Sequence, residues 1–162
     1  MTKYLLLIPL LFGFMALSGC AKTGAPGTPG LPSGTDATLA KIVLAEGDVN
    51  VGVSGALQIT QQLFNGGTID KQTAITIANV LAKVTAANGE AIKITRGLVN
   101  LPASQRSAIQ SIIVPIVNAV QDSLSNGLIA IKDANAKASI SAALSSLLVT
   151  LEIIQSNTGG AQ

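Results

Sequence analysis

The chain has 162 residues, a formal net charge of +2, one cysteine and no histidine. Charged residues make up 11% and apolar residues 48%, whereas soluble domains usually carry about 25% charged residues. These counts exclude an internal disulfide, a histidine-based catalytic triad and a histidine-ligated metal site, and so weak a charge does not favour nucleic acid as a partner. The length is sufficient for one domain with its own core.

The chain begins with an apolar leader. Lys3 provides a minimal positive charge, and residues 4–17 form an almost unbroken apolar run. This run has the length of the core of a signal peptide and is shorter than the about 20 residues that a membrane span needs. We therefore expect residues 1–19 to be a signal peptide.

Four residues at the end of the leader form a processing motif: Leu17, Ser18, Gly19 and Cys20. The motif resembles the lipobox of bacterial lipoproteins, in which a leucine, a small residue and a glycine or alanine precede the cysteine. This resemblance covers only the signal segment. It implies that the leader is removed and that Cys20 is lipidated, and an anchor of two or more acyl chains holds a protein to a membrane essentially permanently.

The residue after the cysteine bears on the destination of the protein. In lipoproteins of enteric-type bacteria an aspartate at this position favours the inner membrane, whereas this chain has Ala21. The resemblance therefore implies a place in the cell envelope, with the lipid anchor in the outer membrane if the source has two membranes. An ordinary secretory signal that happens to end beside a cysteine is the alternative.

Residues 20–36 predict a flexible tether that starts at the lipidated cysteine. Glycine, proline, threonine and serine dominate this stretch. It has too little apolar surface to offset the entropy lost on ordering. We expect a disordered stalk that holds a folded domain away from the membrane.

Residues 37–156 predict a bundle of about four long helices. The first helix is expected to begin after the N-cap Asp36 and to end at the Asn-Gly-Gly run of residues 65–67. Its apolar face has Glu46 and Thr60 as polar interruptions, and its other positions are Leu39, Ile42, Val49, Val53, Ala56 and Leu63.

A second helix is expected from about Asp70 to about Asn100, with Thr68 as a candidate N-cap. Its apolar positions recur at alternating steps of four and three, which is the heptad pattern of a coiled coil. These positions are Thr73, Ile77, Val80, Val84, Ala87, Ala91, Ile94, Leu98 and Leu101. A row of small residues predicts a face that another helix can approach closely: Ala78, Ala82 and Ala86.

Pro102 separates the second helix from a third, in which Pro115 predicts a kink. The third helix has the apolar positions Ile109, Ile113, Ile116, Val120 and Leu124. Asn126-Gly127 breaks this pattern, and a change of phase predicts a fourth helix that starts between Leu128 and Asp133. The fourth helix has the apolar positions Ile140, Leu144, Leu147, Leu151 and Ile154.

Short connections between these helices predict an all-α, up-down bundle. Pairing of two helices with another copy of the chain is the alternative arrangement. Residues 157–162 are polar, and we expect them to be a disordered tail. No stretch after Leu17 is apolar over enough positions to predict a transmembrane span.

Groups that could perform catalysis are scarce. Glu46 and Glu152 are the only acids on predicted core positions. They are either a buried acid pair or ligand contact, or they lie at the edge of an apolar helix face and point to water. The rarity of buried glutamate favours the second interpretation. The serine and threonine hydroxyls have no base to activate them. The sequence therefore predicts no catalytic residue, no metal site and no cofactor, and ligand-binding residues stay unknown.

The densest basic region comprises Lys83, Lys93, Arg96 and Arg106, with Glu90 among them. Lipid headgroups or an anionic polymer could contact such a region, but so sparse a set is more typical of a solvated helix face. Recognition of nucleic acid would need more charge and more stacking aromatics.

These features favour an envelope lipoprotein that is anchored to a membrane through its N-terminal lipid. The helical domain would be an interaction or structural module without catalytic activity, with another envelope protein or a second copy as its partner. A lipoprotein that binds a small apolar ligand or lipid within the bundle is the alternative. A phage-encoded envelope lipoprotein that acts in lysis or superinfection exclusion is a second alternative.

Overall fold

Helices occupy most of residues 31–159, which is the part of the chain that the computed structural model describes. The elements are α1 (Ala37–Asn65), α2 (Lys71–Thr95), α3 (Ala103–Asp122), the short π-helical turn η1 (Ser123–Gly127) and α4 (Ala134–Thr158). The predicted fold class, an all-α bundle of four long helices, is confirmed. The leader, the lipobox, Cys20 and the tether up to residue 30 lie outside the described residues.

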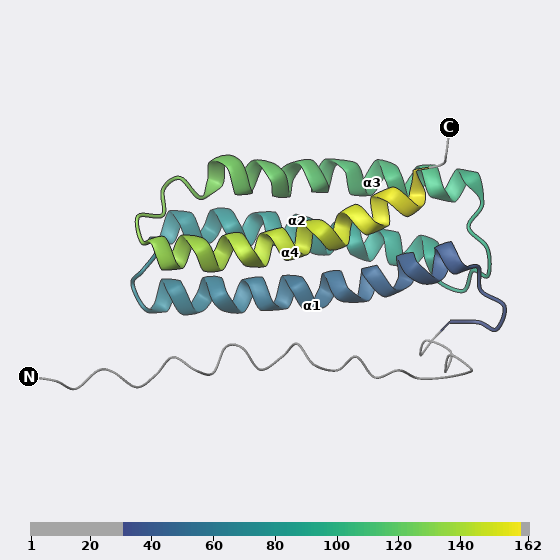
Figure 1. The fold of residues 1–162 in the computed structure, drawn as a ribbon, viewed down its shortest axis with the longest axis horizontal. Coiled ribbons are helices and arrows are strands. Elements are labelled where there is room, and N and C mark those ends of the chain that lie inside the picture. The colour runs from purple at the N-terminus through teal and green to yellow at the C-terminus, as the bar shows by residue number, and fades with distance from the viewer. Residues whose placement is uncertain (1–30, 160–162) are drawn as a thin grey trace, which may run out of the picture.

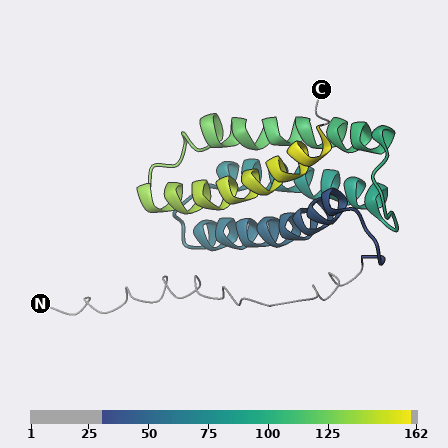
Figure 2. The ribbon, with the colours of Figure 1, turned by 45° about the vertical axis from the view of Figure 1, so that its right-hand side comes forward.

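The four helices run up and down along one axis (Figure 1). Each packs against two others, because α1 and α3 both lie beside α2 and α4. Figure 2 shows the same arrangement from a second direction. The start of α1, the α2–α3 connection and the end of α4 meet at one end of the bundle, which we call the N-terminal end (Figure 1).

An aspartate is the N-cap of three of the helices. The backbone amides in the first turn of a helix have no acceptor within the helix, and the aspartate side chain provides one. Backbone amides in the first turn donate to these aspartates: Leu39 and Thr38 to Asp36, Thr73 to Asp70, and Ala136 to Asp133. These amides hold the pKa of Asp36 and of Asp70 below the usual value. The prediction of Asp36 as the N-cap of the first helix is confirmed. The prediction of Thr68 as the N-cap of the second helix is wrong, because Asp70 caps α2 and the Thr68 amide donates to the Leu63 carbonyl at the end of α1.

All five apolar positions predicted for the fourth helix are buried in α4: Ile140, Leu144, Leu147, Leu151 and Ile154. The predicted face of α1 is also buried, including Glu46 and Thr60, and its Leu63 is half-buried. Gly52 of α1 lies against α4, since a Cβ at this position would come within 3.3 Å of Leu147 Cδ1. The missing side chain therefore allows α1 and α4 to pack closely.

The buried face of α2 differs from the predicted heptad pattern. Its buried residues are Thr73, Ile77, Leu81, Val84, Ala87, Asn88, Ala91 and Thr95. Val80 and Ile94, which the heptad pattern places in the core, are only half-buried. A straight helix has about 3.6 residues per turn, so its inner face drifts away from a strict repeat of seven residues. The drift turns Asn88 and Thr95 inward.

α2 differs from the prediction in two further ways. It ends at Thr95 rather than near Asn100, and Gly97 follows with a φ of +75°, a left-handed conformation that glycine adopts without strain. Ala82 and Ala86 are exposed, so the predicted row of small residues does not receive a neighbouring helix.

The second half of the chain differs from the prediction mainly at its boundaries. α3 buries Ile109, Ile113, Val117 and Val120, while the predicted Ile116 and Leu124 are half-buried. Pro115 lies inside α3 and is exposed. α4 continues to Thr158, whose side chain is buried. Residues 157 and 158 are therefore helical and do not belong to a disordered tail.

Residues 31–36 belong to the folded domain and not to the predicted tether. The amide of Asp36 donates to the Val99 carbonyl at 2.8 Å, and the Thr35 hydroxyl donates to the Pro32 carbonyl at 2.7 Å. Leu31 is half-buried. The hydrogen bond from Asp36 to Val99 attaches the segment to the α2–α3 connection, which the composition of the segment alone does not indicate.

α4 is long and apolar enough to cross a membrane by its length and composition, although the sequence predicted no span after Leu17. It is the single helix of this kind within residues 31–159. Its predicted stripe is buried against the other helices, and the core helix of a bundle meets the same criterion, because an apolar inner face raises its average hydropathy.

Candidate functional site: a buried glutamate beside a pocket

Glu46 is the one charged side chain that is buried within residues 31–159, with 2% of its surface exposed. It lies on the inner face of α1, between the core residues Ile42 and Val49. The interpretation of Glu46 as a stripe edge that faces water is therefore wrong. The heptad face of α1 continues through this position without a change of phase, and that continuity outweighs the rarity of buried glutamate.

The hydrogen-bond partner of Glu46 comes from α2. Thr95 Oγ1 lies 2.9 Å from Glu46 Oε2 and 3.2 Å from Oε1. The same hydroxyl is also within 3.3 Å of the Ala91 carbonyl and 3.2 Å of the Ile92 carbonyl. A hydroxyl has one hydrogen to donate, so the carboxyl oxygens and these carbonyls compete for it.

Burial raises the pKa of Glu46 to about 7, against an ordinary value of 4.5, and the hydrogen bond from Thr95 opposes the rise. No positive charge contributes to this shift. The reason is desolvation, because a charged carboxylate loses hydration when it is buried. In the neutral form the carboxyl can itself donate to Thr95 Oγ1, which then donates to a backbone carbonyl, and the hydrogen-bond chain is complete.

A second polar contact joins the same two helices. Asn88 of α2 is fully buried, and its Nδ2 donates to the Glu46 carbonyl at 2.9 Å and to Asn50 Oδ1 at 3.1 Å. Asn88 Oδ1 is buried without a hydrogen-bond partner. Glu46, Asn50, Asn88 and Thr95 thus form a polar layer between α1 and α2.

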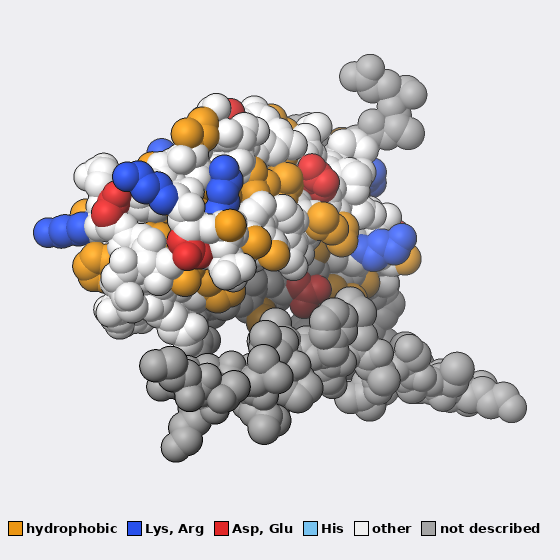
Figure 3. Space-filling view, turned by 60° about the vertical axis from the view of Figure 1, so that its left-hand side comes forward, with side chains coloured by type: hydrophobic (Ala, Val, Ile, Leu, Met, Phe, Trp, Pro, Cys, Tyr) orange, Lys and Arg blue, Asp and Glu red, His pale blue; other side chains and the backbone are white. Residues whose placement is uncertain are grey.

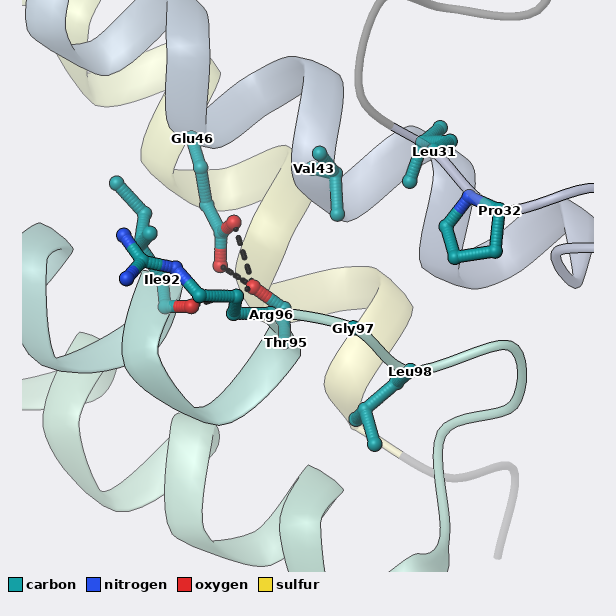
Figure 4. A pocket seen from close by; sticks show the side chains of 9 residues that line it. All are labelled: Leu31, Pro32, Val43, Glu46, Ile92, Thr95, Arg96, Gly97 and Leu98. Atoms are coloured by element: carbon teal, nitrogen blue, oxygen red, sulfur yellow. Dashed lines mark hydrogen bonds between the residues drawn. The ribbon is translucent and has the colours of Figure 1, made fainter.

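A pocket of about 410 Å³ opens beside Glu46 at the N-terminal end of the bundle (Figure 4). Val43 and Glu46 reach it from α1, and Ile92 and Thr95 from α2. The rest of the lining comes from the α2–α3 connection and the N-terminal segment, through Arg96, Gly97, Leu98, Leu31 and Pro32. Pro32, Arg96 and Gly97 are exposed and Glu46 is buried, so the pocket has a solvent-exposed mouth and a buried acid at its floor.

The other acid on a predicted core position lies apart from this site. Glu152 of α4 is exposed, as the favoured interpretation of the sequence has it, and its Oε1 is 3.5 Å from Gln121 Nε2. Glu46 is bonded to α2 and Glu152 to α3, so the two acids do not form a pair. Within residues 31–159, no three acidic, histidine or cysteine side chains come together as metal ligands would.

The four basic residues are solvated, as the sequence indicates. Lys83, Lys93, Arg96 and Arg106 are all exposed. Arg106 Nε donates to the Leu101 carbonyl at 3.0 Å, which fixes the α2–α3 connection to the start of α3. Arg96 is the member of this set that borders the pocket.

The surface carries several exposed apolar side chains in addition to the pocket. Val51 and Leu44 of α1 are 73% and 49% exposed, and Val149 of α4 is 57% exposed. In Figure 3, hydrophobic side chains are interspersed with charged and other groups across the face that is shown. Single exposed apolar residues are ordinary on protein surfaces.

Sequence reasoning missed Asn88 and Thr95 as members of the site. A search of the second helix at 3.6 residues per turn, instead of 3.5, places both on the inner face. Comparison with protein-family models, curated proteins and solved structures finds no match for this chain.

Proposed function

We propose that the chain is a lipid-anchored lipoprotein of the bacterial cell envelope, whose helical bundle is an interaction or structural module without catalytic activity. The observation that carries the proposal is the sequence Leu17-Ser18-Gly19-Cys20 at the end of an apolar leader. It resembles the lipobox at each of its four positions. The anchor would be the lipid on Cys20, in the outer membrane of a source that has two membranes.

The order of segments along the chain supports this proposal. A lipobox, a stretch rich in glycine and proline, and a helical domain follow one another. The domain begins at its N-terminal end, 11 positions after Cys20, with Leu31 at the pocket. An extended chain spans about 3.3–3.6 Å per residue, so such an anchor would hold this end of the bundle within about 40 Å of the membrane.

The chemistry of the described residues supports a module that binds rather than reacts. Its buried acid contacts a threonine hydroxyl, and the pocket beside it has mainly apolar walls. The Thr95 hydroxyl is itself buried and lies within hydrogen-bond distance of two backbone carbonyls of its own helix, whereas a nucleophile has to reach its substrate. Exposed Val51 and Val149 on α1 and α4 would be suited to contact with another envelope protein or a second copy.

The experiment is expression in a bacterium, followed by membrane fractionation and intact mass, for wild type and Cys20→Ala. We expect the wild type to lose residues 1–19, to gain the mass of acyl chains and to sediment with membranes. Cys20→Ala is expected to lack the acyl mass. Ser18→Ala is the matched control, because alanine is also small and leaves the motif intact. Equal, soluble and unacylated products from wild type and Cys20→Ala would refute the anchor.

A further inference from the structure

The pocket beside Glu46 combines two kinds of lining. Its walls are largely apolar, from Leu31, Val43, Ile92 and Leu98, while its floor carries the carboxyl of Glu46, a residue with 2% of its surface exposed. Ligand sites in proteins commonly have this composition, in which apolar walls surround a few polar groups that fix the orientation of the ligand. We propose that this pocket binds a small organic ammonium ion, with the ammonium on Glu46 and an apolar substituent against the walls.

The incomplete hydrogen bonding of Glu46 in its ionised form is the first argument. An ionised carboxylate has about four acceptor sites, and among the described residues its side-chain oxygens have the Thr95 hydroxyl as their one partner. That hydroxyl is shared with two backbone carbonyls. A buried charge without a counter-charge is costly. A cation in the pocket would supply both the missing charge and the missing hydrogen-bond donors.

The lining decides which kind of cation fits. A calcium ion takes six to eight oxygen ligands, whereas the side-chain oxygens that line the pocket are those of Glu46 and Thr95. An ammonium group needs fewer acceptors, and its carbon substituent would cover the leucine, valine and isoleucine side chains. A volume of about 410 Å³ lies within the range of about 300–1,000 Å³ for small-molecule pockets, which accommodates a ring with a short side arm.

Arg96 at the mouth is the competing cation. Its side chain is exposed and lines the pocket, but the hydrogen bonds of the Glu46 carboxyl are to Thr95 and not to Arg96. It therefore does not neutralise Glu46. If Arg96 and not Glu46 were the group that binds the ligand, the pocket would prefer anions to cations. A set of three ligands that differ in charge distinguishes these two possibilities.

The test uses benzylammonium, benzyl alcohol and benzoate, which share one ring and differ in charge. Binding is followed by NMR at the methyl groups of Val43, Ile92 and Leu98. The protein is used as the bacterium produces it, in phosphatidylcholine nanodiscs if it carries a lipid and in buffer if it does not. A failure of the proposed anchor and a failure of the pocket are therefore separate results.

We expect saturable shifts with benzylammonium at an affinity at least tenfold higher than that of benzyl alcohol, and no saturation with benzoate. Glu46→Gln should lower the affinity for benzylammonium at least tenfold and leave that for benzyl alcohol unchanged, which also shows that the variant has kept its pocket. Glu90→Gln, which neutralises an exposed acid on α2, should behave as wild type.

Three results would overturn the proposal. One is equal affinity for the three ligands or the absence of saturation with all of them, another is a preference for benzoate, and the third is undiminished benzylammonium binding by Glu46→Gln.

Nanodiscs that contain phosphatidylethanolamine distinguish two sources of the same ammonium chemistry. Weaker apparent binding of benzylammonium in these discs assigns the pocket to a lipid headgroup, and unchanged binding assigns it to a soluble amine.

Discussion

The two helical hairpins of the bundle share one apolar core but differ in the polar side chains that they bury. The α1–α2 hairpin buries five polar side chains: Glu46, Thr60, Thr73, Asn88 and Thr95. In the α3–α4 hairpin the one buried polar side chain is Thr158, in the last turn of α4, and its hydroxyl bonds back to the Ile154 carbonyl. The hairpins have the same architecture, so their difference lies in what the interior contains.

The difference separates stability from binding within one small domain. An apolar stripe gains stability from every side chain that it buries, at about 25 cal/mol per Å² of apolar surface. A polar layer gains little net stability, because its groups give up hydrogen bonds to water. The pocket opens on the polar hairpin. We therefore expect the apolar side chains of all four helices to supply most of the stability, and the polar layer of α1–α2 to supply the recognition chemistry.

The largest expected effect is a truncation in the apolar hairpin. Leu151 of α4 is fully buried, and Leu151→Ala should lower the free energy of unfolding by about 2–5 kcal/mol, the range for a leucine that leaves a cavity in a core. Guanidinium unfolding followed by circular dichroism measures this change. Val149→Ala, two residues away and exposed, is the control and should change stability by less than about 0.5 kcal/mol. Similar losses for both variants would mean that α4 does not pack as described.

The polar hairpin is expected to make stability depend on pH. Because the pKa of Glu46 is about 7 in the folded chain against 4.5 ordinarily, the folded state binds more protons than the unfolded state between these values. The contribution is complete below pH 4.5 and is lost as the pH rises through about 7. The full shift corresponds to a loss of up to about 3 kcal/mol.

Glu46→Gln isolates that contribution, because glutamine has the same shape and does not ionise. At pH 8 the variant should be more stable than wild type by up to about 3 kcal/mol, and at pH 4.5 the two should be similar. Urea unfolding at several pH values gives the comparison. Parallel stability curves for the two proteins would show that Glu46 does not titrate with a raised pKa.

The contrast between the hairpins also explains what the sequence could predict. All five predicted core positions of α4 are buried, because an unbroken apolar stripe can be assigned from spacing alone. The polar layer could not be assigned in this way. Thr95 is 49 residues from Glu46 in the chain, so the partner that permits a buried carboxyl becomes visible only when α1 and α2 are packed together.

The boundary errors have a different origin. The end of α2 depends on Gly97, and its inner face depends on a drift of about 0.1 residue per turn from the heptad period. The attachment of residues 31–36 depends on one backbone hydrogen bond to Val99. Composition and periodicity average over many residues and do not detect single contacts of this kind.

Thr95→Val tests the hydrogen bond inside the polar layer with little change of shape. The Thr95 hydroxyl lowers the pKa of Glu46 against the effect of burial, so its removal should raise the pKa of Glu46 above that of the wild type. A loss of about 1–2 kcal/mol of stability at pH 8 is expected, because an ionised carboxylate loses a hydrogen bond. Carbon-13 NMR of the Glu46 carboxyl measures the pKa. A lower pKa in Thr95→Val would contradict the hydrogen bond.

The smallest expected effect returns to the apolar hairpin, where the polar groups lie at the helix ends. Asp133 accepts a hydrogen bond from the Ala136 amide at 2.8 Å and is the N-cap of α4. Asp133→Ala should cost about 1 kcal/mol, and Asp133→Asn should be close to neutral, because asparagine caps a helix about as well as aspartate. Thermal unfolding of both variants at one pH separates the hydrogen bond from the charge. Equal losses would show that α4 depends on the negative charge near its first turn, and equal neutrality would show that packing against α1 and α3 alone sets where α4 begins.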